Sequence, residues 1–159
     1  MNIVKRSKVL PFYAVNNGEF VRMTGFTQAS VNRSPIEYSR QYIDEEFKRN
    51  DVVGYDTAMS FSFDLFEDNA VHADIANIAE KEFVGGEAIR EIVSVDLSSI
   101  DKNGSCRAVK RSFSVMVENE GDTSEAYTYS GSFKASGEKV FGRAVSDDNW
   151  QTCTFTEGE

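Results

Sequence analysis

The chain has 159 residues, the size of one domain, and its 40% hydrophobic and 12% aromatic content is that of a folded protein. Its formal net charge of -9 argues against tight nucleic-acid binding, because such affinity rests on Lys and Arg neutralising phosphates. No apolar run approaches the ~18 residues of a membrane span and no secretory signal is visible, so we expect a protein of cytoplasmic origin without a membrane anchor.

The first 19 residues are interpreted as an N-terminal arm, whose apolar run over residues 9–15 is interrupted by Pro11 and ends at Asn16-Asn17. Beyond them, apolar and polar residues alternate with a period of two, which is typical of strands with one buried and one solvated face. Turn-forming sequences separate several of these segments, which favours a mostly antiparallel sheet. The predicted strands cover residues 20–26, 28–33, 36–43, 52–56, 57–65, 89–97, 112–118, 127–133 and 150–155.

Residues 40–56 are predicted to form a long hairpin with a charged tip. A run of charges is usually only a solvated loop. Phe47 in the middle of the run favours contact with another subunit, because an aromatic ring on a projecting charged loop has nothing of its own chain to pack against. The candidate contact residues are Asp44, Glu45, Glu46, Phe47, Lys48, Arg49 and Asp51.

One helix is predicted over residues 69–84, lying across the sheet. Asp68 or Asn69 can cap its start, and Gly85-Gly86 supplies residues that a left-handed helix end prefers. The apolar stripe at helical spacing consists of Val71, Ile75, Ile78, Ala79 and Phe83.

The residues that catalysis needs are sparse, so we expect no enzyme, no cofactor and no metal site. His72 is the single histidine, and a surface or half-buried structural role suits it better than a ligand role. Cys106 and Cys153 have no metal-ligand spacing and are interpreted as reduced thiols. The adjacent carboxylates of residues 44–46 and 147–148 lack the spacing of a calcium loop.

Taken in order and spacing, several segments together resemble the major tail tube proteins of long-tailed, siphovirus-like bacteriophages over roughly residues 22–143. These segments are residues 37–45, residues 53–55 with the alternating strand to Leu65, the helix after Asn69, residues 91–97, residues 108–115, and residues 130–133 with the turn at Gly137. The turn at 120–122 departs from the family, which favours a double glycine there.

The resemblance implies a mainly β fold in one tail tube domain over residues 1–159, an antiparallel β-sandwich or barrel with one flanking α-helix. It further implies hexameric rings whose inner sheets join into a continuous inner β-barrel, with the hairpin of residues 40–56 reaching the next ring. The expected function is that of a structural virion protein, whose stacked rings form a negatively charged conduit for DNA ejection. The implied partners are further copies of the chain, the tape measure protein, and the tail tip and terminator proteins. The implied location is the virion tail, assembled in the bacterial host cytoplasm.

Small polar side chains suit a channel wall, because Arg and Lys would hold the phosphates and slow the passage of DNA. DNA is expected to pass through the lumen without specific binding. The candidate lumen residues on the solvated strand faces are Ser30, Asn32, Ser60, Ser62, Asp64, Ser94 and Asp96.

Two alternatives stay open. One keeps the architecture and places the chain in the tube of a contractile tail, a phage-like bacteriocin or a type VI secretion device. The other is a monomeric carbohydrate-binding β-sandwich, for which the single Trp150 offers no aromatic cluster in the sequence.

Overall fold

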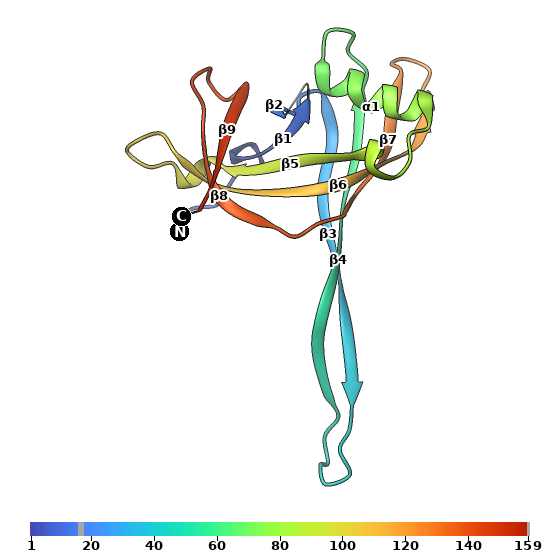
Figure 1. Ribbon diagram of the computed structural model, residues 1–159, viewed down its shortest axis with the longest axis vertical. Coiled ribbons are helices and arrows are strands. Elements are labelled where there is room, and N and C mark those ends of the chain that lie inside the picture. The colour runs from blue at the N-terminus through green and yellow to red at the C-terminus, as the bar shows by residue number, and fades with distance from the viewer. Residues whose placement is uncertain (16–17, 159) are drawn as a thin grey trace.

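The structure is a computed structural model that describes residues 1–15 and 18–158, so the predicted end of the apolar run at Asn16-Asn17 lies outside the described residues. Nine strands form one sheet in the order β3-β4-β7-β6-β5-β1-β2-β9-β8, and every strand pair is antiparallel (Figure 1). The mainly β, antiparallel prediction is therefore confirmed. The strands are β1 (Val9–Val15), β2 (Glu19–Arg22), β3 (Phe26–Arg40), β4 (Arg49–Asp64), β5 (Ile89–Asp96), β6 (Cys106–Glu120), β7 (Thr128–Ala135), β8 (Val140–Val145) and β9 (Thr152–Glu157).

Part of this sheet closes on itself. β8 follows β9 at the end of the strand order, and it also pairs with β6 over Cys106–Lys110. The strands β6, β5, β1, β2, β9 and β8 thus form a small barrel instead of one half of a sandwich. Its interior is filled by Leu10, Phe12, Val93, Val95, Cys106, Ala108, Ala144 and Cys153. Both cysteines are free and buried there.

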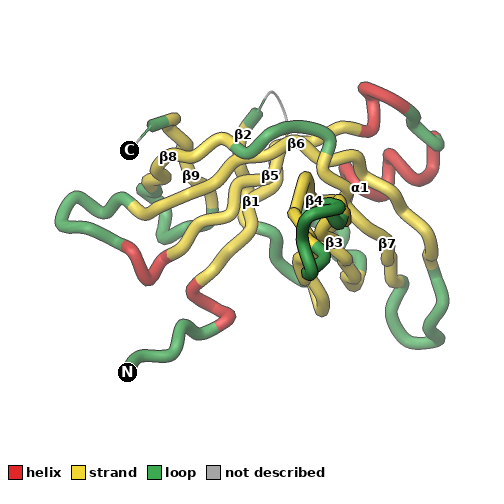
Figure 2. The backbone as a smooth tube through the Cα atoms, turned by 90° about the horizontal axis from the view of Figure 1, so that it is seen from below, coloured by secondary structure: helices red, strands yellow, loops and turns green. Residues whose placement is uncertain are grey.

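β7, β4 and β3 extend the sheet away from the barrel, and the α-helix α1 (Ala70–Lys81) packs on one face of this extension (Figures 1 and 2). A second core lies between the helix and the sheet. Its large members are Tyr13, Phe61, Phe63, Val71, Ile75, Ile78, Ile92, Phe113 and Phe133. Only α1 and the short 3-10 helices η1 (Arg6–Lys8), η2 (Gly85–Ala88) and η3 (Leu97–Ser99) occur in the described residues, and none is long and apolar enough to cross a membrane.

The helix begins as predicted but ends earlier. The Asn69 side chain accepts hydrogen bonds from the backbone N–H groups of Val71 and His72, at 3.0 and 3.1 Å. Glu82, with φ of 50°, takes the left-handed position that the sequence assigned to Gly85-Gly86. The two glycines instead begin η2, which leads into β5.

His72 is structural and more buried than the sequence predicts, with no exposed surface. Its ring stacks on Phe63 at a centroid distance of 4.3 Å. Nδ1 accepts a hydrogen bond from the backbone N–H of Phe66 at 3.1 Å, which leaves Nε2 to donate to the Thr24 carbonyl oxygen at 2.7 Å. Burial lowers the pKa of His72, which favours the neutral ring. Through its two hydrogen bonds the ring links the start of α1 to the backbone at Thr24 and at Phe66.

The prediction of an N-terminal arm is wrong for residues 9–15, which form β1 between β5 and β2. Phe12 enters the barrel core and Tyr13 enters the core under α1, and neither is exposed. A strand buried on both faces has no alternation to reveal it. Pro11, which has no N–H to donate, pairs with Ser94 of β5, and on its other side its carbonyl oxygen accepts a hydrogen bond from the backbone N–H of Met23, just past β2, at 3.1 Å.

Candidate assembly surface

The β3–β4 hairpin is the most prominent feature of the molecule. Its strands pair from Phe26 with Phe63 to Arg40 with Arg49, while β7 covers β4 only over Ala58–Asp64. Beyond that point the two strands leave the body as an uncovered ribbon (Figure 1). We call residues 34–40 and 49–56 the stalk and residues 41–48 the tip. At a rise of about 3.3 Å per residue, seven stalk residues on β3 span about 23 Å.

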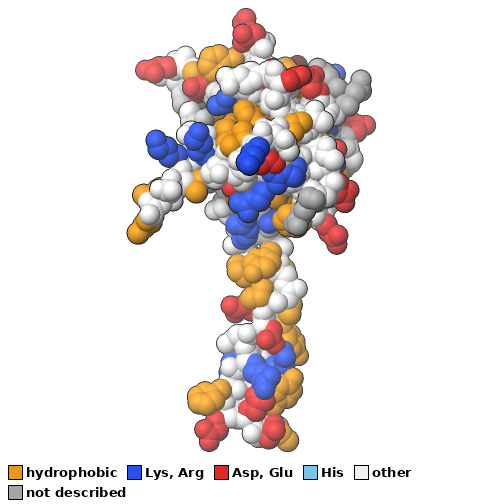
Figure 3. All heavy atoms as spheres, turned by 90° about the vertical axis from the view of Figure 1, so that its left-hand side faces the viewer, with side chains coloured by type: hydrophobic (Ala, Val, Ile, Leu, Met, Phe, Trp, Pro, Cys, Tyr) orange, Lys and Arg blue, Asp and Glu red, His pale blue; other side chains and the backbone are white. Residues whose placement is uncertain are grey.

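The stalk exposes large apolar side chains over its whole length (Figure 3). An isolated two-stranded hairpin is marginally stable in water, and extensive exposed apolar surface marks interaction sites. The stalk therefore has the character of a surface that is buried against another molecule. Its exposed apolar residues, with their exposed fractions, are Ile36 (52%), Tyr38 (55%), Val52 (55%), Val53 (63%) and Tyr55 (58%).

Ion pairs and stacked side chains hold the tip and the adjoining end of the stalk together. Arg49 donates two hydrogen bonds of 2.8 Å to the Glu45 carboxylate, and Arg40 forms a 2.7 Å ion pair with Asp51. The Arg40 guanidinium also lies 5.5 Å from the ring centre of Tyr42. This frame leaves Phe47 projecting into solvent with 79% of its surface exposed.

The predicted contact residues do not all lie in the tip. Asp44, Glu45, Glu46, Phe47 and Lys48 do, whereas Arg49 and Asp51 belong to β4 and pair with Arg40 and Tyr38 of β3. The centre of the tip, residues 41–48, thus lies about three residues before the centre of the charged run, residues 44–51. The hairpin is also longer than the predicted residues 40–56, since it begins at Phe26 and ends at Asp64.

The extended part of the sheet has two edges without a partner strand in the described residues. One is the outer edge of β3. The other is the end of β6, because the pairing with β5 stops at Ser114 and Ile89 while β6 continues to Glu120. A groove of about 470 Å³ follows this second edge, between Val115–Glu120 and the end of α1 with Phe83 and Val84. Unpaired edges are ready templates for strand addition.

Five of the candidate lumen residues share one face of the sheet. Ser60 pairs with Ser30 on one side and Ser132 on the other, and Ser62 pairs with Gln28 and Ser130. Paired residues point to the same face, so serines from three neighbouring strands form one polar surface. Residues of the same strand phase, which belong to this surface, are Asn32, Asp64, Ser114 and Lys134.

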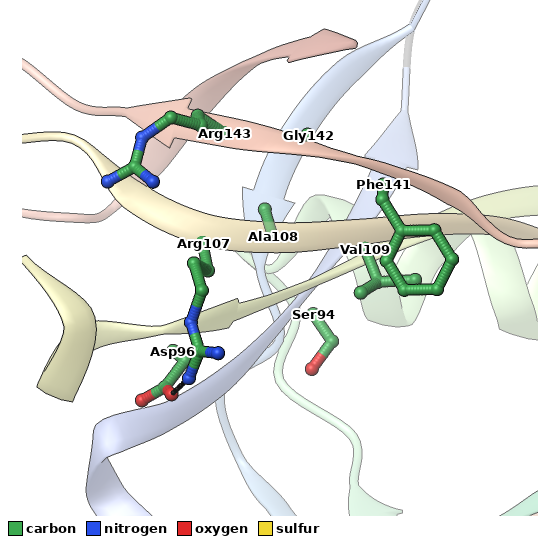
Figure 4. Close-up of a pocket in the computed structure, with 8 residues that line it drawn as sticks. All are labelled: Ser94, Asp96, Arg107, Ala108, Val109, Phe141, Gly142 and Arg143. Atoms are coloured by element: carbon green, nitrogen blue, oxygen red, sulfur yellow. Dashed lines mark hydrogen bonds and ion pairs between the residues drawn. The ribbon is translucent and has the colours of Figure 1, made fainter. Parts of the chain in front are cut away.

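Ser94 and Asp96 lie on the opposite face, so the seven candidates do not form one surface. On β5 they alternate with Val93 and Val95, which point into the barrel. The outward side of the barrel carries a groove of about 470 Å³ where Ser94 and Asp96 meet side chains from β6 and β8 (Figure 4).

Asp96 has a local structural role. It accepts hydrogen bonds from the N–H of Ser98 at 3.0 Å and from Arg107 at 3.0 Å, and thereby caps η3. The Ser98 hydroxyl is the main cause that lowers the pKa of Asp96 below its usual range. These contacts explain why an aspartate stands at the end of β5, and they do not require that Asp96 line a channel.

Sequence reasoning missed most of the apolar stalk. Val52, Val53 and Tyr55 stood in predicted strands, where apolar residues indicate a core. Ile43 in the tip is fully exposed to solvent. The available signal was the pair Val52-Val53, whose adjacent apolar side chains break the alternation of a half-buried strand.

Neither a protein-family model nor a curated protein sequence gives a match to the chain, so the function is argued from the hairpin, the edges and the polar face.

Proposed function

We propose that this chain is the repeating subunit of a bacteriophage tail tube, a structural protein that polymerises as stacked hexameric rings into a conduit for DNA ejection. The observation that carries the proposal is the stalk, a ribbon about 23 Å long with apolar side chains exposed along its whole length. The hexameric symmetry, the tape measure and tail tip partners, and the virion location come from the sequence resemblance.

The stalk supports stacking along one axis. Its exposed Tyr38, Val53 and Tyr55 gain about 25 cal/mol for each Å² of apolar area removed from water, and only a second molecule can remove that area. Phe47 at the tip adds an aromatic anchor of the kind that dominates binding energy. A subunit that inserts its hairpin into an equivalent neighbour repeats the same contact along a tube.

The two open edges support closure within a ring. The outer edge of β3 and the end of β6 are different surfaces at opposite sides of the part of the sheet formed by β3, β4, β7 and the end of β6. Pairing of one with the other is a heterologous, head-to-tail contact, which generates a ring where the rotation closes. Sheet closure between subunits also removes the edges that a monomer would leave open to aggregation.

The serine-rich face supports the role as a conduit. In such a ring the strands β3, β4, β7 and β6 form the inner wall, and α1 covers their other face. The wall then presents hydroxyl, amide and carboxylate groups from Ser30, Asn32, Ser60, Ser62 and Asp64. Lys134, paired with Ala58, is a cation on this face and lies at the end of β7 nearest the stalk.

Negative-stain electron microscopy of the purified protein tests the proposal, with rings or tubes as the expected result. A variant in which residues 41–48 are replaced by Asn-Gly joins the paired Arg40 and Arg49 through a two-residue turn. This variant should remain folded and form rings but not extended tubes. If the parent protein forms nothing but monomers at high concentration, with or without tail-tip proteins as nuclei, the proposal is contradicted.

A further inference from the structure

The body of the molecule has an acidic end opposite the stalk. β4 runs from the tip to Asp64, so the loop that follows it lies at the far end of the body. The loop between β6 and β7 lies beside it, because the backbone N–H of Leu65 donates to the Tyr127 carbonyl oxygen at 2.8 Å. Neither loop contains Lys or Arg. The acidic end comprises the exposed residues Glu67, Asp68, Glu120, Asp122 and Glu125.

The opposite end carries a basic cluster where the stalk leaves the body. Arg33 stands on β3 at the last pairs before the stalk, and Lys139 is in the loop that follows β7. Arg111 donates to the Gly137 carbonyl oxygen of that loop at 2.7 Å. Figure 3 shows Lys and Arg side chains gathered on the body directly above the hairpin. We call Arg33, Arg111 and Lys139 the basic collar.

The cations of the collar are close enough to affect one another. Burial, and then the charges of Arg33 and Arg111, lower the pKa of Lys139. Within residues 1–15 and 18–158, none of the three has a carboxylate oxygen within 4.0 Å, although Glu138 neighbours Lys139 in sequence. Unpaired like charges side by side are unfavourable in the isolated subunit. A negative surface placed against the collar would relieve this repulsion.

Carboxylates of the acidic end are equally without cationic partners in the described residues. Glu120 accepts a hydrogen bond from the Tyr127 hydroxyl at 2.8 Å and Asp122 accepts one from the Thr128 hydroxyl at 2.7 Å. None of the five takes part in an ion pair. The two ends therefore carry opposite, unpaired charge along the direction in which the hairpin points.

We infer that the basic collar of one copy binds the acidic end of the next copy along the axis, and that this pairing sets the polarity and register of stacking. The inference rests on the proposed function, for which it names the axial contact surface. In a head-to-tail stack every stalk points the same way, so each collar faces the acidic end of the next copy. A reversed copy would bring like charges together, which disfavours that orientation.

The test measures the protein concentration at which tubes form, using Lys139→Glu and Glu125→Lys as single charge reversals. Each should raise that concentration about tenfold, since like charges in an interface weaken binding. The combined variant, with a reversed charge at both ends, should recover most of the loss. Lys102→Glu, which makes the same charge change in the exposed loop before β6, should assemble like the parent.

Ionic strength supplies a second readout. Raising salt from about 0.05 to about 0.5 M shortens the screening length severalfold, so parent tubes should need a higher protein concentration to form. Equal assembly of Lys139→Glu and Lys102→Glu, or assembly indifferent to salt, would overturn the inference and leave the proposed function standing. A parent protein that forms neither rings nor tubes would instead refute the proposed function.

Discussion

Replacing Phe47 by Ala should weaken tube assembly without affecting the fold of the subunit. The ring is 79% exposed in the monomer, so its removal should change the free energy of unfolding by no more than about 0.5 kcal/mol. A Phe side chain offers roughly 200 Å² of surface, of which about 160 Å² remains to be buried in the assembly. At about 25 cal/mol per Å² this gives an upper bound of about 4 kcal/mol per contact. Burial of about half of that area would contribute about 2 kcal/mol per contact, which corresponds to a factor of roughly 30 in affinity.

The assay is sedimentation of tubes over a series of protein concentrations, accompanied by thermal unfolding of the unassembled subunit. Ile100→Ala is a matched control, because Ile100 is also exposed, at 53%, but lies after η3 and away from the hairpin. If Phe47→Ala and Ile100→Ala polymerise at the same concentration as the parent protein, the tip does not bind another subunit and the argument from its exposure fails.

Three further expectations concern the channel wall, the buried histidine and a strand contact. Ser62→Arg, on the polar face between Gln28 and Ser130, should still fold and form tubes. It should slow DNA ejection from reconstituted particles, and more strongly at low salt. Normal ejection rates at low salt would place this face outside the lumen. Because burial lowers the pKa of His72 below 6.5, stability should be complete above that value and should fall as the pH drops below it, by at most about 1.4 kcal/mol per pH unit. Urea unfolding between about pH 7.5 and about pH 5.5 checks this, and His72→Gln should remove that part of the slope. Gly131→Ala would place a Cβ 2.0 Å from the Met116 carbonyl oxygen and should destabilise the β6–β7 pair by about 3 kcal/mol or more, whereas Gly86→Ala, which meets no atom within 4 Å, should not. Equal midpoints of urea unfolding for the two glycine variants would contradict this reading.

The strongest periodic signals identified their elements correctly. The alternation over residues 57–65 corresponds to the inner half of β4, where Met59, Phe61 and Phe63 are buried and the intervening serines are not. The helical stripe found α1, in which Val71, Ile75 and Ile78 are buried. Both signals are reliable because each element has one buried and one open face. Buried residues therefore recur at every second position of the strand and at every third or fourth position of the helix.

The elements that escaped prediction lack that asymmetry. β1 buries both faces, because it lies where the barrel core meets the core under α1. β8 was not predicted at all; it is a short strand in which Gly142 and Ala144 replace larger core residues. For the stalk the prediction fails in the opposite way, because apolar residues that indicate a core are exposed. Val53 and Tyr55 stand on a ribbon that has no core of its own.

The sequence by itself determined the strand-rich class, the one helix, the charged tip and the small polar side chains of the candidate wall, because these depend on local spacing and composition. The tertiary structure alone decided which residues share a face, which edges stay open and which charges gather at each end. Ser94 and Ser60 are both polar residues in alternating strands, yet the path of the sheet through β6 and β7 puts them on opposite faces. Arg33, Arg111 and Lys139 are far apart in the chain and meet only because β3, β6 and the loop after β7 converge at the base of the stalk.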